Sequence, residues 1–307
     1  MHYVLGGDIM QVYSMPRNIW RAVYPVLIFL GISFFVVFAV MVGYAFHLAV
    51  EIAVAGDVIN QASIEQRLMG FVTEFGMLIQ LIAGVLTVAF FVLMWRKVRT
   101  RIPQFENNKL TPLLIVLAVL GFAGLNIFLA VVFAATDIYR HFPSYAEVAQ
   151  ALMGGSFMMR VLALGIAAPI AEELCCRGVV FNRLNSWAPS WVAVLVSSAL
   201  FALMHMDLLQ GMYAFAVGVL FCILYIRYRN LWIPIIGHIA FNMANVVLVE
   251  AIKISGVEEM NALALLIPSL LITAVCTVLM IKRTKPAIPA KPAASDAPAA
   301  AIEAAIE

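Results

Sequence analysis

The chain has 307 residues, of which 64% are hydrophobic and only 12% are charged, about half the charged share of an ordinary soluble protein. The formal net charge is +2, and the basic residues are scattered through loops, so there is no nucleic-acid-binding surface. Several continuous apolar runs could cross the roughly 30 Å of hydrocarbon in a bilayer. The composition excludes a soluble domain and disfavours a β-barrel, whose strands alternate. It predicts an all-α polytopic bundle of transmembrane helices.

The apolar runs predict eight spans. In chain order these are Ala22–Val50, Phe71–Met94, Leu113–Ala135, Met153–Arg183, Trp191–His205, Gly211–Tyr225, Ile233–Val249 and Ala262–Ile281. The fifth and sixth are short, about 23 Å each, so the turn MDLLQG between them is expected to lie below the membrane surface. Non-helical backbone is tolerated at that depth only against protein or water. The short spans therefore indicate an aqueous pocket inside the bundle.

The basic residues predict how the spans are oriented. With the N-terminus in the cytosol, 15 Lys and Arg residues fall on the cytoplasmic side and 4 on the other, so both termini are expected to be cytosolic. The protein is then a multi-pass protein of the cell inner membrane. Residues 282–307 are rich in Ala and Pro and predict a disordered cytosolic tail. Residues 1–281 form one membrane domain.

Two adjacent carboxylates and a guanidinium interrupt the fourth span, in the stretch PIAEELCCRG at 169–178. Glu173 and Arg177 share a helix face four residues apart and are expected to pair. Glu172 lies about 100° around the helix from Glu173, so its charge has no local compensation. Pro169 removes a backbone donor and is expected to bend the helix. A structural ion pair would explain Glu173 and Arg177, whereas Glu172 is a functional-site hypothesis.

Two later spans carry imidazole and amide groups at helical spacing. In FALMH, the ring of Phe201 can pack against His205, and in HIAFN, His238 and Asn242 share a face that Asn245 extends. Each motif alone is more simply explained by a buried histidine or by hydrogen bonds between helices. Together with the carboxylates of the fourth span, they supply the groups that handle water and a developing oxyanion away from bulk solvent.

The ordered set EExxxR, FxxxH and HxxxN resembles the three motifs of the CAAX protease and bacteriocin-processing (CPBP) family. This is the Abi group of intramembrane peptidases, which includes the type II CAAX prenyl endopeptidases. The resemblance covers roughly residues 153–249, the expected catalytic core. It implies a membrane hydrolase, an intramembrane endopeptidase, whose substrates are prenylated C-terminal peptides, leader peptides or membrane-protein segments. The implied partners are such a peptide or lipidated peptide and the lipid bilayer, with no nucleic acid.

The resemblance also implies a role for each motif residue. Glu172 resembles the general base that activates water, with His205 assisting it. His238 and Asn242 resemble the groups that hold the water or stabilise the oxyanion, and an asparagine amide suits that task. Two further residues resemble groups that organise the site: Glu173 and Arg177. A partly desolvated carboxylate also suits a general base.

A metal is the open question in this mechanism, because members of the family have been described both as metalloproteases and as glutamate proteases. If a divalent metal such as Zn²⁺ is present, its ligands are expected to be Glu172, His205 and His238. The chain has no HExxH, the helical zinc motif, and we favour a glutamate mechanism that requires no cofactor. Cys176, four residues after Glu172, is expected to line the pocket as a small apolar side chain.

Two other functions stay open. One is a non-catalytic immunity or scaffold protein of the same fold, against which the intact motifs argue. The other is a proton-coupled transporter, against which the lack of an inverted repeat argues.

One geometric difficulty accompanies the peptidase hypothesis, because helical rise places Glu172, His205 and His238 at depths that differ by about 12 Å. Helix tilt and the bend at Pro169 must bring them together.

Overall fold

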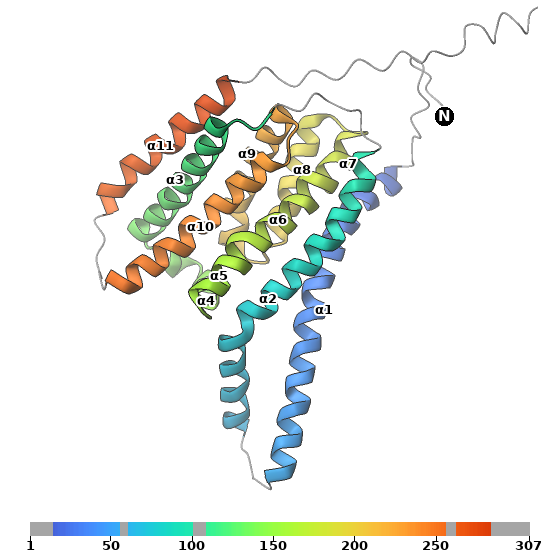
Figure 1. Ribbon diagram of the computed structural model, residues 1–307, viewed down its shortest axis with the longest axis vertical. Coiled ribbons are helices and arrows are strands. Elements are labelled where there is room, and N and C mark those ends of the chain that lie inside the picture. Colours follow the sequence, from blue (N-terminus) through green and yellow to red (C-terminus); the bar gives the residue numbers. More distant parts are fainter. Residues whose placement is uncertain (1–14, 56–60, 101–108, 256–261, 284–307) are drawn as a thin grey trace, which may run out of the picture.

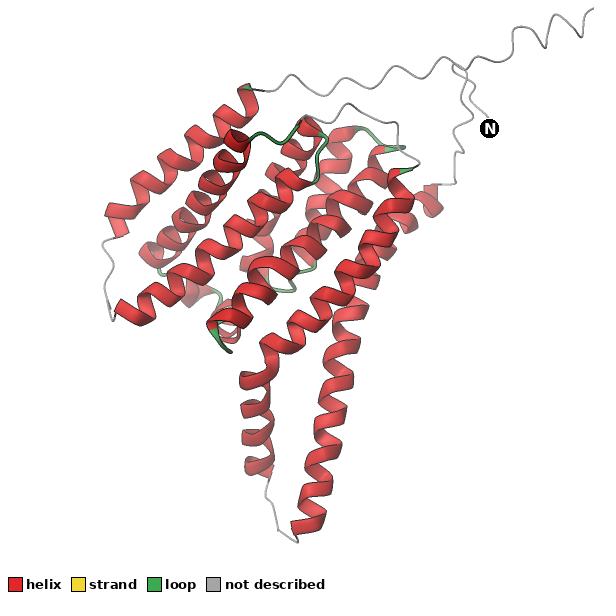
Figure 2. Ribbon diagram, in the orientation of Figure 1, coloured by secondary structure: helices red, strands yellow, loops and turns green. Residues whose placement is uncertain are grey.

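The computed structural model describes residues 15–55, 61–100, 109–255 and 262–283, and the regular elements in these ranges are all helical (Figure 2). Six helices are long and apolar enough to cross a membrane. They are α1 (Met15–Ala55), α2 (Gln61–Arg99), α3 (Pro112–Thr136), α9 (Leu208–Tyr228), α10 (Trp232–Ser255) and α11 (Ala262–Lys282). The predicted polytopic helical bundle is confirmed.

The remaining elements lie between α3 and α9. The fourth predicted span is one continuous helical run made of α5 (Phe157–Arg160), the π-helical η2 (Val161–Ala167), α6 (Ala168–Glu173), the π-helical η3 (Leu174–Phe181) and α7 (Asn182–Asn185). We call this run, residues 157–185, the carboxylate helix. Before it come η1 (Ile138–His141) and α4 (Pro143–Leu152), and after it comes α8 (Ser190–Leu203).

All eight predicted spans fall on helices, but the lengths and compositions of these helices do not support eight separate membrane crossings. Helix α8 has 14 residues and covers only about 21 Å, so it is too short to cross the hydrocarbon alone. The carboxylate helix meets α4 at a bend of 114°, and the two count as a span only as a bent pair. The described residues therefore contain six candidate spans, or seven with the bent pair. Most of the predicted tail, from residue 284 onward, lies outside the described residues.

The helices lie side by side, with α3 and α11 along one edge of the bundle and α1 and α2 along the opposite edge (Figure 1). Helix α10 lies between α3 and the carboxylate helix, and α8 and α9 pack together against η3. Helices α1 and α2 continue beyond the other helices as a hairpin (Figure 1). The carboxylate helix is thus enclosed by α1, α2, α8, α9 and α10.

Two apolar clusters fix the helices on either side of the site. One surrounds η3, joins it to α1, α2, α8 and α9, and includes the fully buried Phe91 and Phe181. The other joins α3, α9, α10 and α11 around Phe122 and Phe221, whose rings lie 4.8 Å apart. Helices in a bilayer associate through close packing and interhelical hydrogen bonds rather than through the hydrophobic effect. The clusters therefore set the distance between the carboxylate helix and α10.

Pro169 changes the hydrogen bonding of its helix without ending it. In η2, the N–H of Ala168 donates to the carbonyl of Ala163, five residues earlier. The next donor in this register would be Pro169, which has no N–H, so the carbonyl of Leu164 lacks that backbone partner. Asn242 of α10 takes its place, with Nδ2 donating to the Leu164 oxygen at 2.9 Å. π-Helical turns are rare and occur mostly at functional sites. This one ties the carboxylate helix to the helix that carries the HxxxN motif.

Candidate functional site

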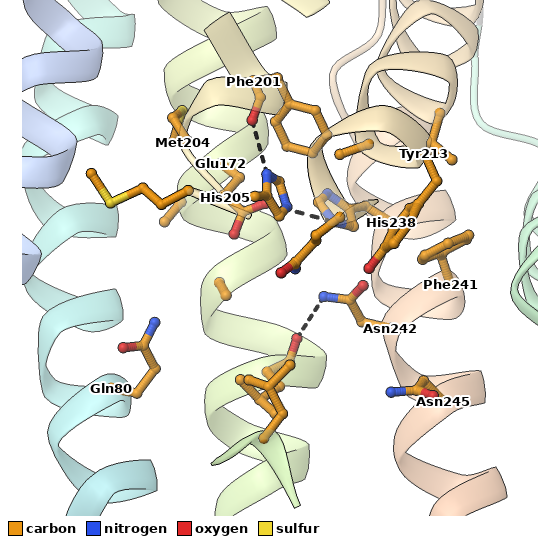
Figure 3. Close-up of a pocket in the computed structure, with 18 of the residues that line it drawn as sticks. Gln80, Glu172, Phe201, Met204, His205, Tyr213, His238, Phe241, Asn242 and Asn245 are labelled. Atoms are coloured by element: carbon orange, nitrogen blue, oxygen red, sulfur yellow. Dashed lines mark hydrogen bonds and ion pairs between the residues drawn. The ribbon is translucent and has the colours of Figure 1, made fainter. Parts of the chain in front are cut away.

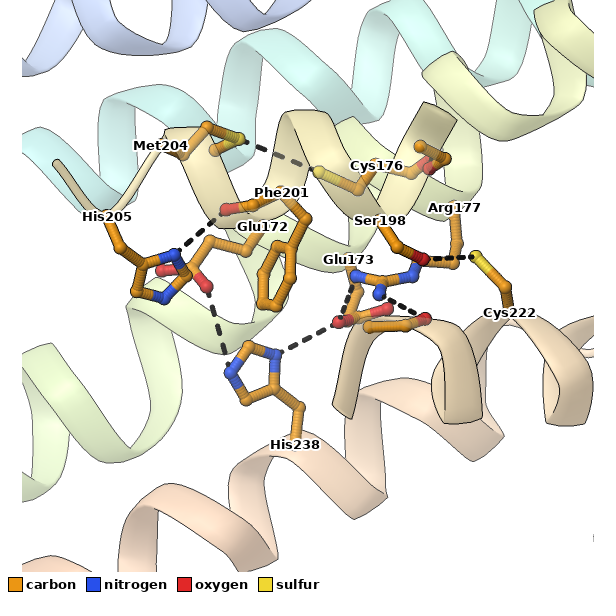
Figure 4. A network of polar contacts seen from close by, with 12 residues as sticks. Glu172, Glu173, Cys176, Arg177, Ser198, Phe201, Met204, His205, Cys222 and His238 are labelled. Carbon is orange, nitrogen blue, oxygen red and sulfur yellow. Dashed lines mark hydrogen bonds and ion pairs between the residues drawn. The ribbon is translucent and has the colours of Figure 1, made fainter. Parts of the chain in front are cut away.

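Glu173 is fully buried and holds two side chains through one oxygen (Figure 4). Its Oε1 accepts a hydrogen bond from Arg177 Nη1 at 2.9 Å and one from His238 Nδ1 at 3.0 Å. The pairing of Glu173 with Arg177 that the spacing predicts is confirmed, whereas the contact with His238 was not predicted. Because a carboxylate can only accept, Nδ1 of His238 carries the proton. Nε2 is then the ring nitrogen that faces Glu172.

Arg177 is also fully buried, and its guanidinium is enclosed on several sides. Nη2 donates to the carbonyl of Gly218 at 2.9 Å, and the guanidinium carbon lies 4.6 Å from the ring centre of Phe201 and 5.2 Å from that of Phe221. A buried cation is stable only with such compensation. A Cβ at Gly218 would lie 3.1 Å from both Arg177 Nη2 and Phe201 Cδ1. Glycine therefore lets the backbone of α9 approach the guanidinium.

Glu172 is the carboxylate that the ion pair leaves free. Its Oε2 lies 3.7 Å from His238 Nε2, beyond hydrogen-bonding distance, and this buried oxygen has no hydrogen-bond partner in the described part of the protein. Figure 4 shows its carboxylate between the rings of His205 and His238. The side chain is 16% exposed, compared with 0% for Glu173. The two adjacent carboxylates therefore differ, since Oε1 of Glu173 is held by two protein groups inside the bundle, whereas Glu172 is partly exposed and makes no such contact through Oε2.

Phe201 orients both imidazoles. Nδ1 of His205 lies 2.9 Å from the carbonyl oxygen of Phe201, which can only accept, so this nitrogen carries a proton and Nε2 is left for other contacts. The Phe201 ring meets the imidazoles of His205 and His238 edge-on, with centroid distances of 4.9 and 5.7 Å. The packing of Phe201 against His205 that the FxxxH spacing predicts is confirmed.

The four residues to which the motifs assign catalytic roles line one cavity of about 440 Å³. Figure 3 shows Glu172, His205, His238 and Asn242 around it. Packing of the tilted helices therefore overcomes the depth difference of about 12 Å that helical rise alone gives. The prediction that Cys176 lines this cavity is wrong, because it is fully buried, with Sγ 3.6 Å from the Met204 sulfur.

Helices outside the three motifs supply much of the cavity wall, which the sequence analysis missed. Asn126 of α3 lines the cavity, and its buried Oδ1 has no hydrogen-bond partner in the described part of the protein. Tyr213 of α9 stands edge-on to Tyr145 of α4, with ring centres 6.3 Å apart, and both line the cavity. Asn126 had a sequence signal, since an amide within a long apolar run requires a polar neighbour or a cavity. Tyr145 had none, because α4 was not predicted, and Tyr213 had none although it lies in the sixth predicted span.

The residues that would hold a metal are not arranged for one. In the described ranges, no three His, Cys, Asp or Glu side chains form a group that could hold a metal ion. His238 Nε2 and Glu172 Oε2, two of the expected ligand atoms, lie 3.7 Å apart. We therefore derive no catalytic step through a metal.

Comparison with known proteins identifies the same segment. Residues 154–244 match the family model of the type II CAAX prenyl endopeptidases, Rce1-like. The chain is also 32% identical over 84 residues to "Putative membrane peptidase YdiL" of Bacillus subtilis (strain 168), across 27% of this chain and 34% of that protein. The chain thus aligns with about a third of the length of this curated relative. No solved structure matches the chain. The resemblance inferred from the three motifs is confirmed for the core.

The Glu173–Arg177 pair gives a stability prediction. Glu173→Gln leaves Arg177 as an uncompensated buried cation and is expected to lower the free energy of unfolding by roughly 3–5 kcal/mol. Combining it with Arg177→Met removes both charges, so the double variant should lose less stability than the two single losses added together. Thermal unfolding of the four proteins in detergent measures this coupling. Additive losses would show that the pair does not act as a unit.

A second stability prediction concerns the approach of α9 to the guanidinium. Gly218→Ala places a methyl group against Arg177 and Phe201, and such crowding in a packed interior costs about 1–3 kcal/mol. Gly43→Ala on α1 is the matched control, because a Cβ there meets nothing within 4 Å, and alanine favours a helix. Thermal unfolding should show a loss for Gly218→Ala alone. Equal midpoints for both variants would contradict the close approach.

Proposed function

We propose that this protein, whose core matches the type II CAAX prenyl endopeptidase family, is an intramembrane endopeptidase that hydrolyses peptide bonds with glutamate-activated water. The observation that carries the proposal is the free Glu172 carboxylate in the cavity, facing an imidazole whose other nitrogen is fixed by a second carboxylate. The substrate class is a membrane-associated peptide, namely a prenylated C-terminal peptide, a leader peptide or a membrane-protein segment.

Glu172 is the general base in this mechanism. It takes a proton from water, with Nε2 of His205 assisting, while the water oxygen attacks the carbonyl carbon of the scissile bond. When the tetrahedral intermediate collapses, the C–N bond breaks and Glu172 returns the proton to the leaving amine. Glu172 suits this exchange because no hydrogen bond to protein occupies its Oε2.

Attack by water leaves a negative charge on the oxygen of the scissile carbonyl. This oxyanion needs hydrogen-bond donors from groups other than Glu172. The Asn242 amide has two N–H bonds, one of which holds the Leu164 carbonyl, and the other can serve the substrate oxygen. His238 can donate from Nε2 only as an imidazolium, and Glu173 at 3.0 Å and Glu172 at 3.7 Å would compensate that charge. Preorganised donors of this kind supply a large share of the catalysis of acyl transfer.

The cavity wall supports delivery of the substrate from the membrane. Phe34 and Val37 of α1 line the cavity and are 56% and 41% exposed on the surface of the bundle. One part of the wall is therefore formed by side chains that face lipid.

We also propose that both termini lie in the cytosol. This orientation places the loops with most of the Lys and Arg residues on the cytoplasmic side of the membrane.

The first test separates the two adjacent carboxylates. Glu172→Gln should remain folded and lose at least about 10²–10⁴-fold in rate, the usual contribution of general-base assistance. Cleavage is measured on a quenched-fluorescence peptide library in detergent, with and without a C-terminal prenyl group. Glu147→Gln, an exposed carboxylate on α4, is the matched control and should keep full activity.

Two outcomes of this test would overturn the roles. If Glu172→Gln stays fully active while Glu173→Gln is folded and inactive, the carboxylates have been assigned in the wrong order. If the wild-type protein cleaves no peptide in either form of the library, an immunity, scaffold or transport function replaces the proposal.

A second test addresses the metal. In the glutamate mechanism, extended dialysis against EDTA and 1,10-phenanthroline should leave most of the cleavage activity intact. Metal content by mass spectrometry is measured on the same samples. A stoichiometric zinc whose removal abolishes turnover and whose return restores it would refute the metal-free mechanism.

A further inference from the structure

A second cavity lies away from the catalytic site, between α1, α2 and the α7 end of the carboxylate helix. Its volume is about 400 Å³, and its wall contains three basic side chains: Arg21, Lys97 and Arg183. None of the residues that line it, all within the described ranges, carries a carboxylate. The rest of the wall consists of Tyr24, Asn182, Ser186 and four apolar side chains: Phe90, Leu93, Met94 and Val98. A concave site with three basic side chains and no acid is suited to an anion.

Arg183 is preorganised in this cavity. Pro25 inside α1 has no N–H, so the carbonyl of Arg21, four residues earlier, lacks its helical donor. Arg183 Nη1 donates to that carbonyl at 2.7 Å, and the guanidinium carbon lies 4.9 Å from the ring centre of Tyr24. Nε of Arg183 is buried and has no hydrogen-bond partner in the described part of the protein. The guanidinium is thus fixed on two sides, and its Nε is left without a protein acceptor.

An apolar groove continues from the basic cavity along α1 and α2. The two hollows share Tyr24 and Phe90 in their walls. Beyond them, the groove is lined by side chains of α1 and α2 that are almost all apolar: Leu27, Ile28, Gly31, Ile32, Phe35, Val36 and Leu86. Trp20, of the residue type that gathers at membrane interfaces, stands at the same end of the groove as Tyr24. The basic cavity therefore continues directly into the apolar groove.

We propose that these two hollows together bind one anionic phospholipid, with its phosphate in the cavity of Arg21, Lys97 and Arg183 and an acyl chain in the groove. The phosphate oxygens match the fork of donors that arginine presents, and basic pockets between transmembrane helices are suited to anionic headgroups. The groove supplies the apolar surface that a soluble phosphate would not need. The lipid joins α1, α2 and the carboxylate helix.

The headgroup part of the proposal is tested with one pair of variants. Dioleoyl phosphatidylglycerol is titrated into the full-length protein in uncharged detergent, and the rise of the thermal unfolding midpoint gives an apparent Kd. Lys97→Gln should weaken binding about fivefold, the effect of one basic residue near an anionic lipid surface. Arg96→Gln, its exposed neighbour outside the cavity wall, should change the Kd less than twofold. Equal weakening by both variants would indicate diffuse charge attraction and overturn the site.

The acyl chain is tested with glycines. A Cβ at Gly31 or at Gly43 meets nothing within 4 Å, and leucine favours a helix over glycine, so Gly31→Leu and Gly43→Leu should both fold with midpoints no lower than that of the wild type in the absence of lipid. Only Gly31 lines the groove. Gly31→Leu should therefore abolish the stabilisation by phosphatidylglycerol, and Gly43→Leu should preserve it.

Two further ligands complete the experiment. Dioleoyl phosphatidylcholine, which has the same chains and no net charge, and inorganic phosphate should each stabilise the protein far less than phosphatidylglycerol. If inorganic phosphate stabilises it as well as the lipid does and Gly31→Leu has no effect, the ligand is a soluble phosphate and the proposal is wrong. If phosphatidylcholine binds equally, the basic cavity does not select charge and the proposal is also wrong.

Discussion

One oxygen of the buried Glu173 carboxylate holds two groups from different parts of the chain, and the arrangement of the site depends on it. On one side it binds Arg177 of its own helix, and on the other it binds His238 of α10, at 2.9 and 3.0 Å. A buried charge that lost these partners would be expensive, so the three side chains constrain one another. The result is that His238 turns Nε2 toward Glu172, which itself stays without a partner at Oε2.

Two prolines inside helices each leave a backbone carbonyl without its helical donor, and a side chain from another helix binds that carbonyl. Pro169 leaves the Leu164 carbonyl to the Asn242 amide, and Pro25 leaves the Arg21 carbonyl to the guanidinium of Arg183. In a bilayer no water reaches such a carbonyl from the lipid side, so a side chain from another helix must satisfy it. Each freed carbonyl thus becomes a point of attachment between helices. One attachment lies beside the carboxylates, and the other lies in the proposed lipid cavity.

Local spacing predicted only the part of the site that depends on single helices. Four-residue separation was sufficient to pair Glu173 with Arg177 and Phe201 with His205, because helix geometry alone brings such residues together. The contact of Glu173 with His238 joins residues 65 positions apart, and it depends on the packing of α10 against the carboxylate helix. When the depths of Glu172, His205 and His238 are calculated from the rise of straight helices, they differ by about 12 Å. That calculation includes neither helix tilt nor π-helical turns. The bent entry through α4 and the cavity-lining role of Asn126 are likewise products of packing.

The central claim is that Glu173 fixes the ring of His238, and the protonation of one nitrogen tests it most directly. The measurement is nitrogen-15 solid-state NMR of the histidine-labelled protein in lipid, with the His238 signals assigned by their loss in His238→Gln. The account predicts that Nδ1 of His238 carries a proton at neutral pH in both the wild type and Glu172→Gln, because the carboxylate of Glu173 can only accept. An unprotonated Nδ1 in the wild-type protein would contradict the account, since Glu173 could not then hold the ring that faces Glu172.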